Sequence, residues 1–183
     1  MATSVPASTP EPRRLAAVDE PQLQALADVL IDCVEGGASV SFMLPMTRDK
    51  ALAFWRQVAG GVERGERVLL VVEDAQGIVG TVQVILDQPE NQPHRADVAK
   101  MLVHRRARRQ GAGAALMRAA EAAARAAGKT LLVLDTADAT AARLYARLGW
   151  QPAGRIPRYA LLPAGRECAT TYFYRSLIDE TRA

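Results

Sequence analysis

RRARRQGAGAAL, residues Arg105–Leu116 of this 183-residue sequence, joins a cluster of arginines to a pair of glycines. Four of its first five residues are arginines, and two glycines, Gly111 and Gly113, follow around a single alanine. An apolar run at residues 96–104 precedes the stretch, and an alanine-rich run with helical periodicity follows it. The glycines therefore stand where a strand passes into a helix. Because the first N–H groups of a helix lack internal partners and attract anions, the stretch predicts a phosphate site.

Spacing separates the kinds of phosphate site that such a stretch can form. A Walker P-loop has Lys and then Ser or Thr directly after its second glycine, and this sequence has Ala-Ala-Leu there, which excludes it. A dinucleotide-binding fingerprint needs Gly or Ala at the position of Leu116, although Asp135 stands about where its acidic residue would be. Too few strand–helix units follow for a dinucleotide-binding sheet. A solvated basic loop without a ligand is the remaining alternative.

The composition is that of one globular domain. Hydrophobic residues make up 49% of the chain and charged residues 23%. We expect residues 1–12 to form a flexible tail and residues 13–183 to form a single domain. No apolar run approaches the roughly 20 residues of a membrane span, and the first residues lack the apolar core of a secretory signal. The expected location is the cytoplasm, without a membrane partner.

Charge and metal-ligating residues narrow the function further. The net charge is only +3, and its densest cluster is the quoted stretch, which favours a local anion site over a nucleic-acid surface. We therefore expect no specific nucleic-acid partner. Two cysteines, Cys33 and Cys168, and two histidines are too few for a His/Cys metal cluster. Catalysis is expected to need no metal.

Hydrophobic periodicity predicts an α/β fold with antiparallel strands first and one strand–helix–strand unit in the middle. The predicted elements are a strand at 13–18, helices at 19–37 and 47–61, a hairpin at 67–86 that turns within 73–77, a strand at 96–104, a helix at 111–128, a strand at 129–136, a helix at 139–149, and two closing strands at 150–162 and 167–177.

The order R/Q-x-x-G-x-G/A, here residues 108–113, resembles the coenzyme A loop of the GCN5-related N-acetyltransferases (GNAT). The resemblance spans nearly the whole chain, since it includes the element order, the later ARLYARLGWQPAG (142–154) and the closing strands. The segments VAKMLV, LLVLDT and IPRYALLPAG look like the branch that contains tabtoxin-resistance acetyltransferases. The resemblance implies a GNAT fold: a mixed, mostly antiparallel sheet, flanked by helices, whose two central parallel strands splay apart.

The same resemblance implies acetyl-CoA as cosubstrate and indicates where it binds. The pantetheine arm is expected along the backbone of the central strand, at Met101, Leu102 and Val103. The diphosphate is expected at the start of the following helix, where the residues concerned are Arg108, Arg109, Gln110, Gly111, Ala112, Gly113 and Ala114.

In this family a neutral amine attacks the thioester directly, so three tasks remain for the protein. A backbone N–H near Met101 or Leu102 is expected to stabilise the thioester oxygen. Tyr145, in the Leu-Tyr of the later motif, is expected to protonate the leaving thiolate, although its helical spacing also fits a core residue. The base that deprotonates the amine is Asp97 or Asp135, each of which also has a plain structural role as a strand or turn carboxylate.

These residues predict an N-acetyltransferase that acts on the primary amine of a small molecule, in the tabtoxin-like branch an amino-acid-like toxin or antibiotic. The alternative is a non-catalytic module that senses coenzyme A or binds nucleic acid; the presence of Tyr145 beside the glycine pair favours the enzyme. Acceptor specificity is expected from Phe42, Met43, the 87–94 loop, and Arg158 or Tyr159. A monomer and a homodimer both remain open.

Overall fold

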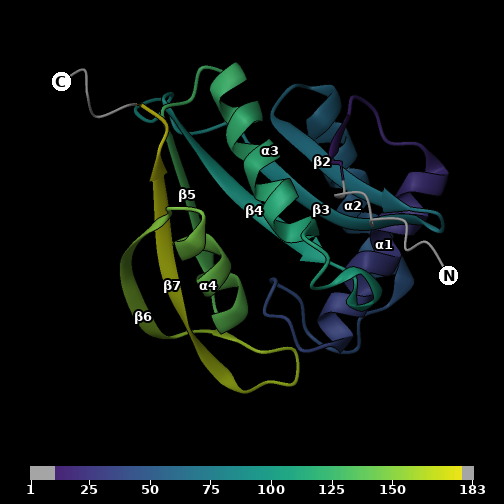
Figure 1. Ribbon diagram of the computed structural model, residues 1–183. Coiled ribbons are helices and arrows are strands. Elements are labelled where there is room, and N and C mark those ends of the chain that lie inside the picture. Colours follow the sequence, from purple (N-terminus) through teal and green to yellow (C-terminus); the bar gives the residue numbers. More distant parts are fainter. Residues whose placement is uncertain (1–10, 179–183) are drawn as a thin grey trace, which may run out of the picture.

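The computed structural model describes residues 11–178, which form a mixed seven-stranded sheet with helices on both of its faces (Figure 1). The strands lie in the order β1-β2-β3-β4-β5-β7-β6, and only β4 and β5 pair in parallel. The predicted fold class is thereby confirmed. Of the expected tail, residues 1–12, only Glu11 and Pro12 lie within the described residues.

The N-terminal elements are β1 (Arg13–Leu15), α1 (Glu20–Glu35) and α2 (Arg48–Glu63). Asp19 caps α1 in a reciprocal arrangement, because its side chain accepts from the N–H of Gln22 at 2.8 Å while the Gln22 side chain accepts from the Asp19 N–H at 3.0 Å. Thr47 caps α2 with a single hydrogen bond, in which its side chain accepts from the N–H of Lys50. The predicted first strand is shorter in the structure, since the chain leaves the sheet after Leu15 to reach the Asp19 cap.

The middle of the chain contains the hairpin of β2 (Arg67–Asp74) and β3 (Gly77–Ile85), then β4 (Arg95–Val103), a short 3-10 turn η1 (Arg105–Ala107) and α3 (Ala112–Ala126). The hairpin turns through two residues, where the Asp74 carboxylate accepts from the N–H of Gln76 at 2.7 Å. The last elements are β5 (Leu131–Thr136), α4 (Ala139–Arg147), β6 (Gln151–Leu161) and β7 (Glu167–Ser176). This is the predicted element order, with ends that differ by a few residues.

Two cores hold the sheet between its helices. Alternate strand residues point to opposite faces, so each face buries its own set. The core under α3 and α4 includes Leu116, Leu132 and Phe173, and the core under α1 and α2 includes Leu30, Trp55 and Leu69. The sheet is therefore supported on both sides.

The two central strands part soon after they meet. β4 and β5 pair only at three positions, from Arg95↔Leu131 to Asp97↔Val133. Beyond these positions β4 stays paired with β3, while β5 stays paired with β7, so the strands diverge toward their C-terminal ends (Figure 1). The splay expected of the two central strands is confirmed.

Candidate active site

The start of α3 has the backbone geometry of an anion site. Gly111 is the residue before the helix and has φ +86°, in the left-handed region that favours glycine. Gly111 offers no side-chain cap, and its carbonyl accepts the first helical hydrogen bond, from the N–H of Ala115 at 3.0 Å. The N–H groups of Ala112, Gly113 and Ala114 therefore precede the first helical bond and are available to an anion.

Gly113 serves a different purpose from Gly111. A Cβ atom on Gly113 would lie 3.1 Å from Cδ2 of Leu144 in α4 and 3.7 Å from Sδ of Met101 in β4. A Cβ atom on Gly111 would meet nothing within 4 Å. The missing side chain of Gly113 therefore allows α3 to pack closely against α4 and β4.

Two of the four arginines anchor the loop to the rest of the protein. Arg105 donates to the Asp32 carboxylate of α1 through its backbone N–H at 2.9 Å and its side-chain Nε at 2.7 Å. Arg106 donates to Asp74 of the β2–β3 turn at 3.1 and 3.3 Å. Burial alone would raise the pKa of the Asp32 carboxyl, but the hydrogen bonds from Arg105 and the charge of His104 hold that pKa below its usual range.

The other two arginines differ from each other. Arg108 donates through Nε to the carbonyl of Val103 at 3.1 Å, and its Nη2 lies 4.0 Å from the thiol of Cys33. Arg109 has φ 62° and, among residues 11–178, takes part in no recorded ion pair or side-chain hydrogen bond. Of the four guanidinium groups, that of Arg109 is the one the described part of the chain leaves available to a phosphate.

The central strand presents an open edge where the pantetheine arm was expected. Val82 of β3 faces two residues of β4, because the register passes from Thr81↔Leu102 to Gln83↔Ala99, and Lys100 at this bulge has φ 51°. Beyond Asp97 the edge of β4 that faces β5 pairs with no strand among the described residues. The edge thus offers main-chain groups at 101 and 102, whereas the Val103 carbonyl already accepts from Arg108 and from the Cys33 thiol.

Tyr145 combines a core ring with an available hydroxyl. The residue is 5% exposed, and its ring centroid lies 6.1 Å from that of Trp150 and 5.8 Å from that of Phe173. No group among the described residues forms a hydrogen bond with its hydroxyl. Burial raises the pKa of Tyr145, so the hydroxyl stays protonated at neutral pH and can act as a proton donor.

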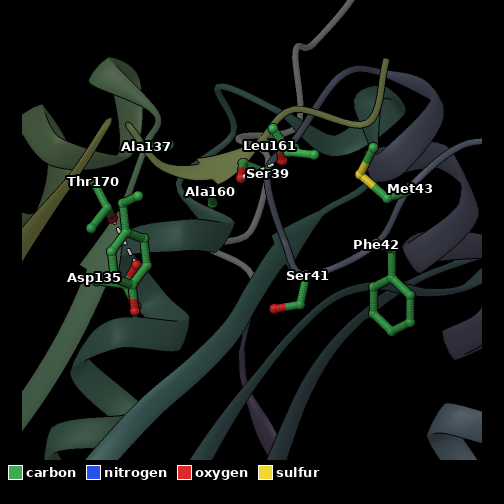
Figure 2. A pocket seen from close by; sticks show the side chains of 10 residues that line it. Ser39, Ser41, Phe42, Met43, Asp135, Ala137, Ala160, Leu161 and Thr170 are labelled. Atoms are coloured by element: carbon green, nitrogen blue, oxygen red, sulfur yellow. Dashed lines mark hydrogen bonds between the residues drawn. The ribbon is translucent and has the colours of Figure 1, made fainter. Parts of the chain in front are cut away.

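The structure separates the two carboxylates. Asp135, on the diverging end of β5, accepts a hydrogen bond from the Thr170 hydroxyl at 2.7 Å and lines a pocket (Figure 2). Asp97 lies where β4 and β5 still pair, accepts from Arg95 at 2.7 Å, and is absent from the pocket lining. The pocket is lined by Ser39, Ser41, Phe42, Met43, Asp135, Ala137, Tyr159, Ala160, Leu161 and Thr170.

The pocket agrees with part of the predicted acceptor border. Phe42, Met43 and Tyr159 line it, whereas Arg158 pairs with Glu167 at 2.7 Å. The 87–94 loop was expected at this border but lies at the other end of β5, where its Pro93 carbonyl accepts from Lys129 at 2.8 Å.

Sequence reasoning missed the serines and the threonine of the pocket, because nothing in their local pattern marks them. It also missed Lys100, although a lysine within the apolar VAKMLV was a readable signal.

Tyr159 also belongs to a polar pair beside Asp135. Its hydroxyl lies 2.7 Å from that of Tyr172, which is the register partner of Asp135 across β5 and β7. The hydrogen bond with Tyr159 raises the pKa of Tyr172 to about 12, with desolvation and the charge of Asp135 adding to the shift. The Tyr172 hydroxyl therefore stays protonated at neutral pH.

Residues 11–178 contain neither a metal-ligating cluster nor a membrane-spanning helix. No three side chains of His, Cys, Asp or Glu gather into a group that could hold a metal ion. None of the helices has the length and apolar character needed to cross a membrane.

Comparison with known proteins gives a match to a family model over part of the chain and a shared fold over nearly all of it. Residues 65–152 match a family model described as acetyltransferase (GNAT) domain. A ribosomal-protein-alanine N-acetyltransferase from Brucella melitensis superposes with a TM-score of 0.77 at 20% identity, covering 90% of this chain and 98% of the other. A phosphinothricin acetyltransferase from Sinorhizobium meliloti, solved with AcCoA, gives 0.76 at 18% identity and covers 96% and 92%. The protein yncA from Salmonella typhimurium, solved with its cofactor acetyl-CoA, gives 0.74 at 19% and covers 96% and 98%.

Proposed function

We propose, from the premise that this chain belongs to the GNAT acetyltransferases, that it transfers the acetyl group of acetyl-CoA to the primary amine of a small molecule. The observation that carries the proposal is the splay of β4 from β5, with uncapped N–H groups at the start of α3 on one side and the Asp135 pocket on the other. An acceptor that resembles an amino-acid toxin or antibiotic is the finer part of the proposal, and a phosphinothricin acetyltransferase among the similar structures supports it.

Acetyl-CoA fits the donors that this chain presents. A diphosphate needs N–H donors and positive charge, and the N–H groups of residues 112–114 together with the Arg109 guanidinium supply both. Gln110 contributes backbone only, because its side chain already donates to the Arg106 carbonyl at 3.1 Å. The open edge of β4 at Met101 and Leu102 is where an extended pantetheine arm would add its own hydrogen bonds.

The acetyl transfer that we propose proceeds by direct attack. The amine nitrogen forms a bond to the thioester carbon, the carbon–sulfur bond breaks, the acetyl group stays on nitrogen as an amide, and the coenzyme A thiolate leaves. Asp135 receives the proton that the amine loses, directly or through water, and its position in the pocket favours it over Asp97. A backbone N–H of β4 near Met101 or Leu102 stabilises the oxygen as charge develops. The Tyr145 hydroxyl protonates the departing thiolate.

The decisive experiment is a screen of small amines with acetyl-CoA, in which thiol release is followed with a chromogenic disulfide and the product mass is checked for one added acetyl group. We expect at least one amine to give both signals. In parallel, acetyl-CoA should raise the melting temperature much more than NADH or ATP, because only a ligand that the site fits stabilises the folded state. Thermal stabilisation without turnover on any amine would instead favour the coenzyme A-sensing module.

A further inference from the structure

Lys100 is a half-buried cation for which the described chain provides no anion. Its ammonium lies 3.3 Å from the Ser41 hydroxyl and 5.6 Å from the centroid of the Phe54 ring. Among residues 11–178, no carboxylate lies within ion-pair distance of it, and Ser41 is its one recorded hydrogen-bond acceptor. Loss of water lowers the pKa of Lys100, while the charge of Asp135 opposes that shift. A partly buried ammonium whose one described hydrogen-bond acceptor is a neutral hydroxyl is available to bind an anion.

The backbone at both ends of this contact is unusual. Lys100 has φ 51° and Ser41 has φ 75°, so both residues occupy the left-handed region that side chains other than glycine rarely adopt. At Lys100 the cause is the β-bulge, which turns the side chain out of the regular alternation of β4. Unfavourable conformations persist where surrounding structure enforces them, and they are found preferentially at binding sites.

The contact adjoins the acceptor pocket and faces an opposite charge. Ser41 and Asp135 both line the pocket. In Figure 2 the Ser41 hydroxyl points toward the side of the pocket on which Asp135 lies. Asp135 and its partner Thr170 come from β5 and β7, whereas Ser41 precedes α2 and Lys100 comes from β4. The pocket therefore has a cation behind one wall and a carboxylate on another.

We propose that Lys100, together with Ser41, binds an oxyanion of the acceptor while Asp135 receives its amine, so that the acceptor is a small zwitterion. This inference rests on the proposed acetyltransferase function and adds the residue that selects the substrate. A carboxylate and a phosphonate offer the same oxyanion chemistry. A neutral amine or a diamine lacks the group that would satisfy the Lys100 ammonium.

The test compares each amino acid with its carboxamide and with the corresponding aminophosphonate, using kcat/KM for thiol release from acetyl-CoA. The amine of a carboxamide is less basic, so a larger fraction is neutral and intrinsic reactivity favours the carboxamide. A preference for the acid therefore reports recognition of the oxyanion. We expect the acid or the phosphonate to exceed the carboxamide by about 10- to 100-fold, the effect of one charge-assisted hydrogen bond, and the better of the two identifies the anion.

Three variants assign that preference to Lys100. In Lys100→Met the preference should fall at least about tenfold, through the loss of activity on the acid alone. Lys100→Arg keeps the positive charge and should therefore retain part of the preference. If Lys100 acted as a general base instead, arginine could not replace it. Lys50→Met is the matched control, because Lys50 lies 5.9 Å from the ring of Phe42 and donates to the Met43 carbonyl, but is not itself among the residues that line the pocket. It should leave the preference unchanged.

Several results would overturn the inference. Carboxamides acetylated as well as acids by the unaltered protein would refute it and leave the acetyltransferase function standing. An equal loss of preference in Lys50→Met would assign the effect to general attraction by positive charge. An unchanged preference in a folded Lys100→Met would remove Lys100 from acceptor binding. If no amine yields thiol, the proposed function itself fails, and the inference fails with it.

Discussion

The two sides of the β4–β5 splay are built on different principles. On the phosphate side the donors are main-chain N–H groups, and two of the four neighbouring arginines, Arg105 and Arg106, are paired with carboxylates. On the acceptor side the pocket is lined by side chains from four separate segments, and the Lys100 ammonium behind it has no carboxylate partner among the described residues. Main-chain donors suit a ligand that is recognised by local backbone geometry, whereas side chains from separate segments suit a ligand that this chain selects.

The largest expected effect is the loss of acetyl-CoA binding when the phosphate side is altered. Gly111→Val should abolish acetyl-CoA binding, because a β-branched residue is strained at φ +86° and its side chain would occupy the space of the diphosphate. At a ligand concentration about 100 times Kd, binding stabilises the unaltered protein by about 2.7 kcal/mol, or roughly 5–11 °C in a chain of this size. The measurement is the shift in melting temperature on adding acetyl-CoA.

Gly128→Val is the control for backbone strain. Gly128 follows the other end of α3, has φ +75°, and likewise has nothing within 4 Å of the position of a Cβ atom. This variant should lose intrinsic stability to a similar extent and keep the full acetyl-CoA shift. A full shift in a folded Gly111→Val protein would mean that the phosphates bind elsewhere.

Tyr145→Phe tests whether the Tyr145 hydroxyl donates a proton to the leaving thiolate. The ring still packs against Trp150 and Phe173, so folding and acetyl-CoA binding should change little. Loss of the proton donor should lower kcat by at least tenfold, since a positioned acid typically contributes about 10² to 10⁴. Initial rates with an accepted amine provide the measurement, under conditions where chemistry limits turnover.

The matched control is Tyr174→Phe, whose hydroxyl donates to Gln151 at 2.6 Å between β6 and β7. Its kcat should be unaffected. A Tyr145→Phe protein with reduced melting temperature and normal kcat would show that Tyr145 has only its core role.

The difference between the two sides also explains what the sequence could predict. The strand, the two glycines and the helix of the phosphate side are consecutive, so periodicity and turn residues sufficed to locate it. The acceptor side joins residues far apart in the chain, such as Lys100 and Ser41, which are 59 positions apart. No local pattern encodes such a contact. It depends on the bulge in β4 and on how the segment before α2 packs.

The same limit applies to individual side chains in the quoted stretch. Four neighbouring arginines look equivalent in sequence, but Arg105 is bound by a carboxylate 73 positions earlier and Arg106 by one 32 positions earlier. Likewise Asp97 and Asp135 are both strand carboxylates, and only the point at which β4 leaves β5 distinguishes them. Tertiary pairing, which periodicity does not report, assigns these roles.

Arg109 and Arg106 allow a guanidinium that is available to the phosphate to be compared with one that is already paired with a carboxylate. Arg109→Ala should weaken acetyl-CoA binding by about tenfold, the loss of one charge-assisted hydrogen bond to phosphate. Arg106→Ala removes an arginine three residues away whose charge is already paired with Asp74, so its effect should stay within about threefold. Calorimetric titration with acetyl-CoA measures both. A larger effect in Arg106→Ala than in Arg109→Ala would contradict the assignment of Arg109 to the phosphate.

The smallest expected effect concerns the anchor beneath the loop. Asp32→Asn keeps an acceptor for the Arg105 N–H but loses the charge in a side chain that is only 9% exposed. The free energy of unfolding should fall by about 1–2 kcal/mol, and KM for acetyl-CoA should rise slightly because the loop is held less firmly. Asp28→Asn, on the same helix, removes an exposed pair with Arg48 and should cost less than about 1 kcal/mol.

The pH dependence of stability tests the same anchor independently. Because the folded protein holds the pKa of Asp32 below its ordinary 3.8, the carboxylate contributes stability that is present above pH 3.8 and is lost as the pH falls through the folded pKa. The unaltered protein should therefore lose more stability in acid than Asp32→Asn, and the two curves should converge at low pH. Urea unfolding from pH 7 to pH 3 gives both curves. Parallel curves over this range would show that Asp32 carries no net electrostatic stabilisation, and the firm anchoring of the phosphate side would then have to come from Arg106 and Arg108 alone.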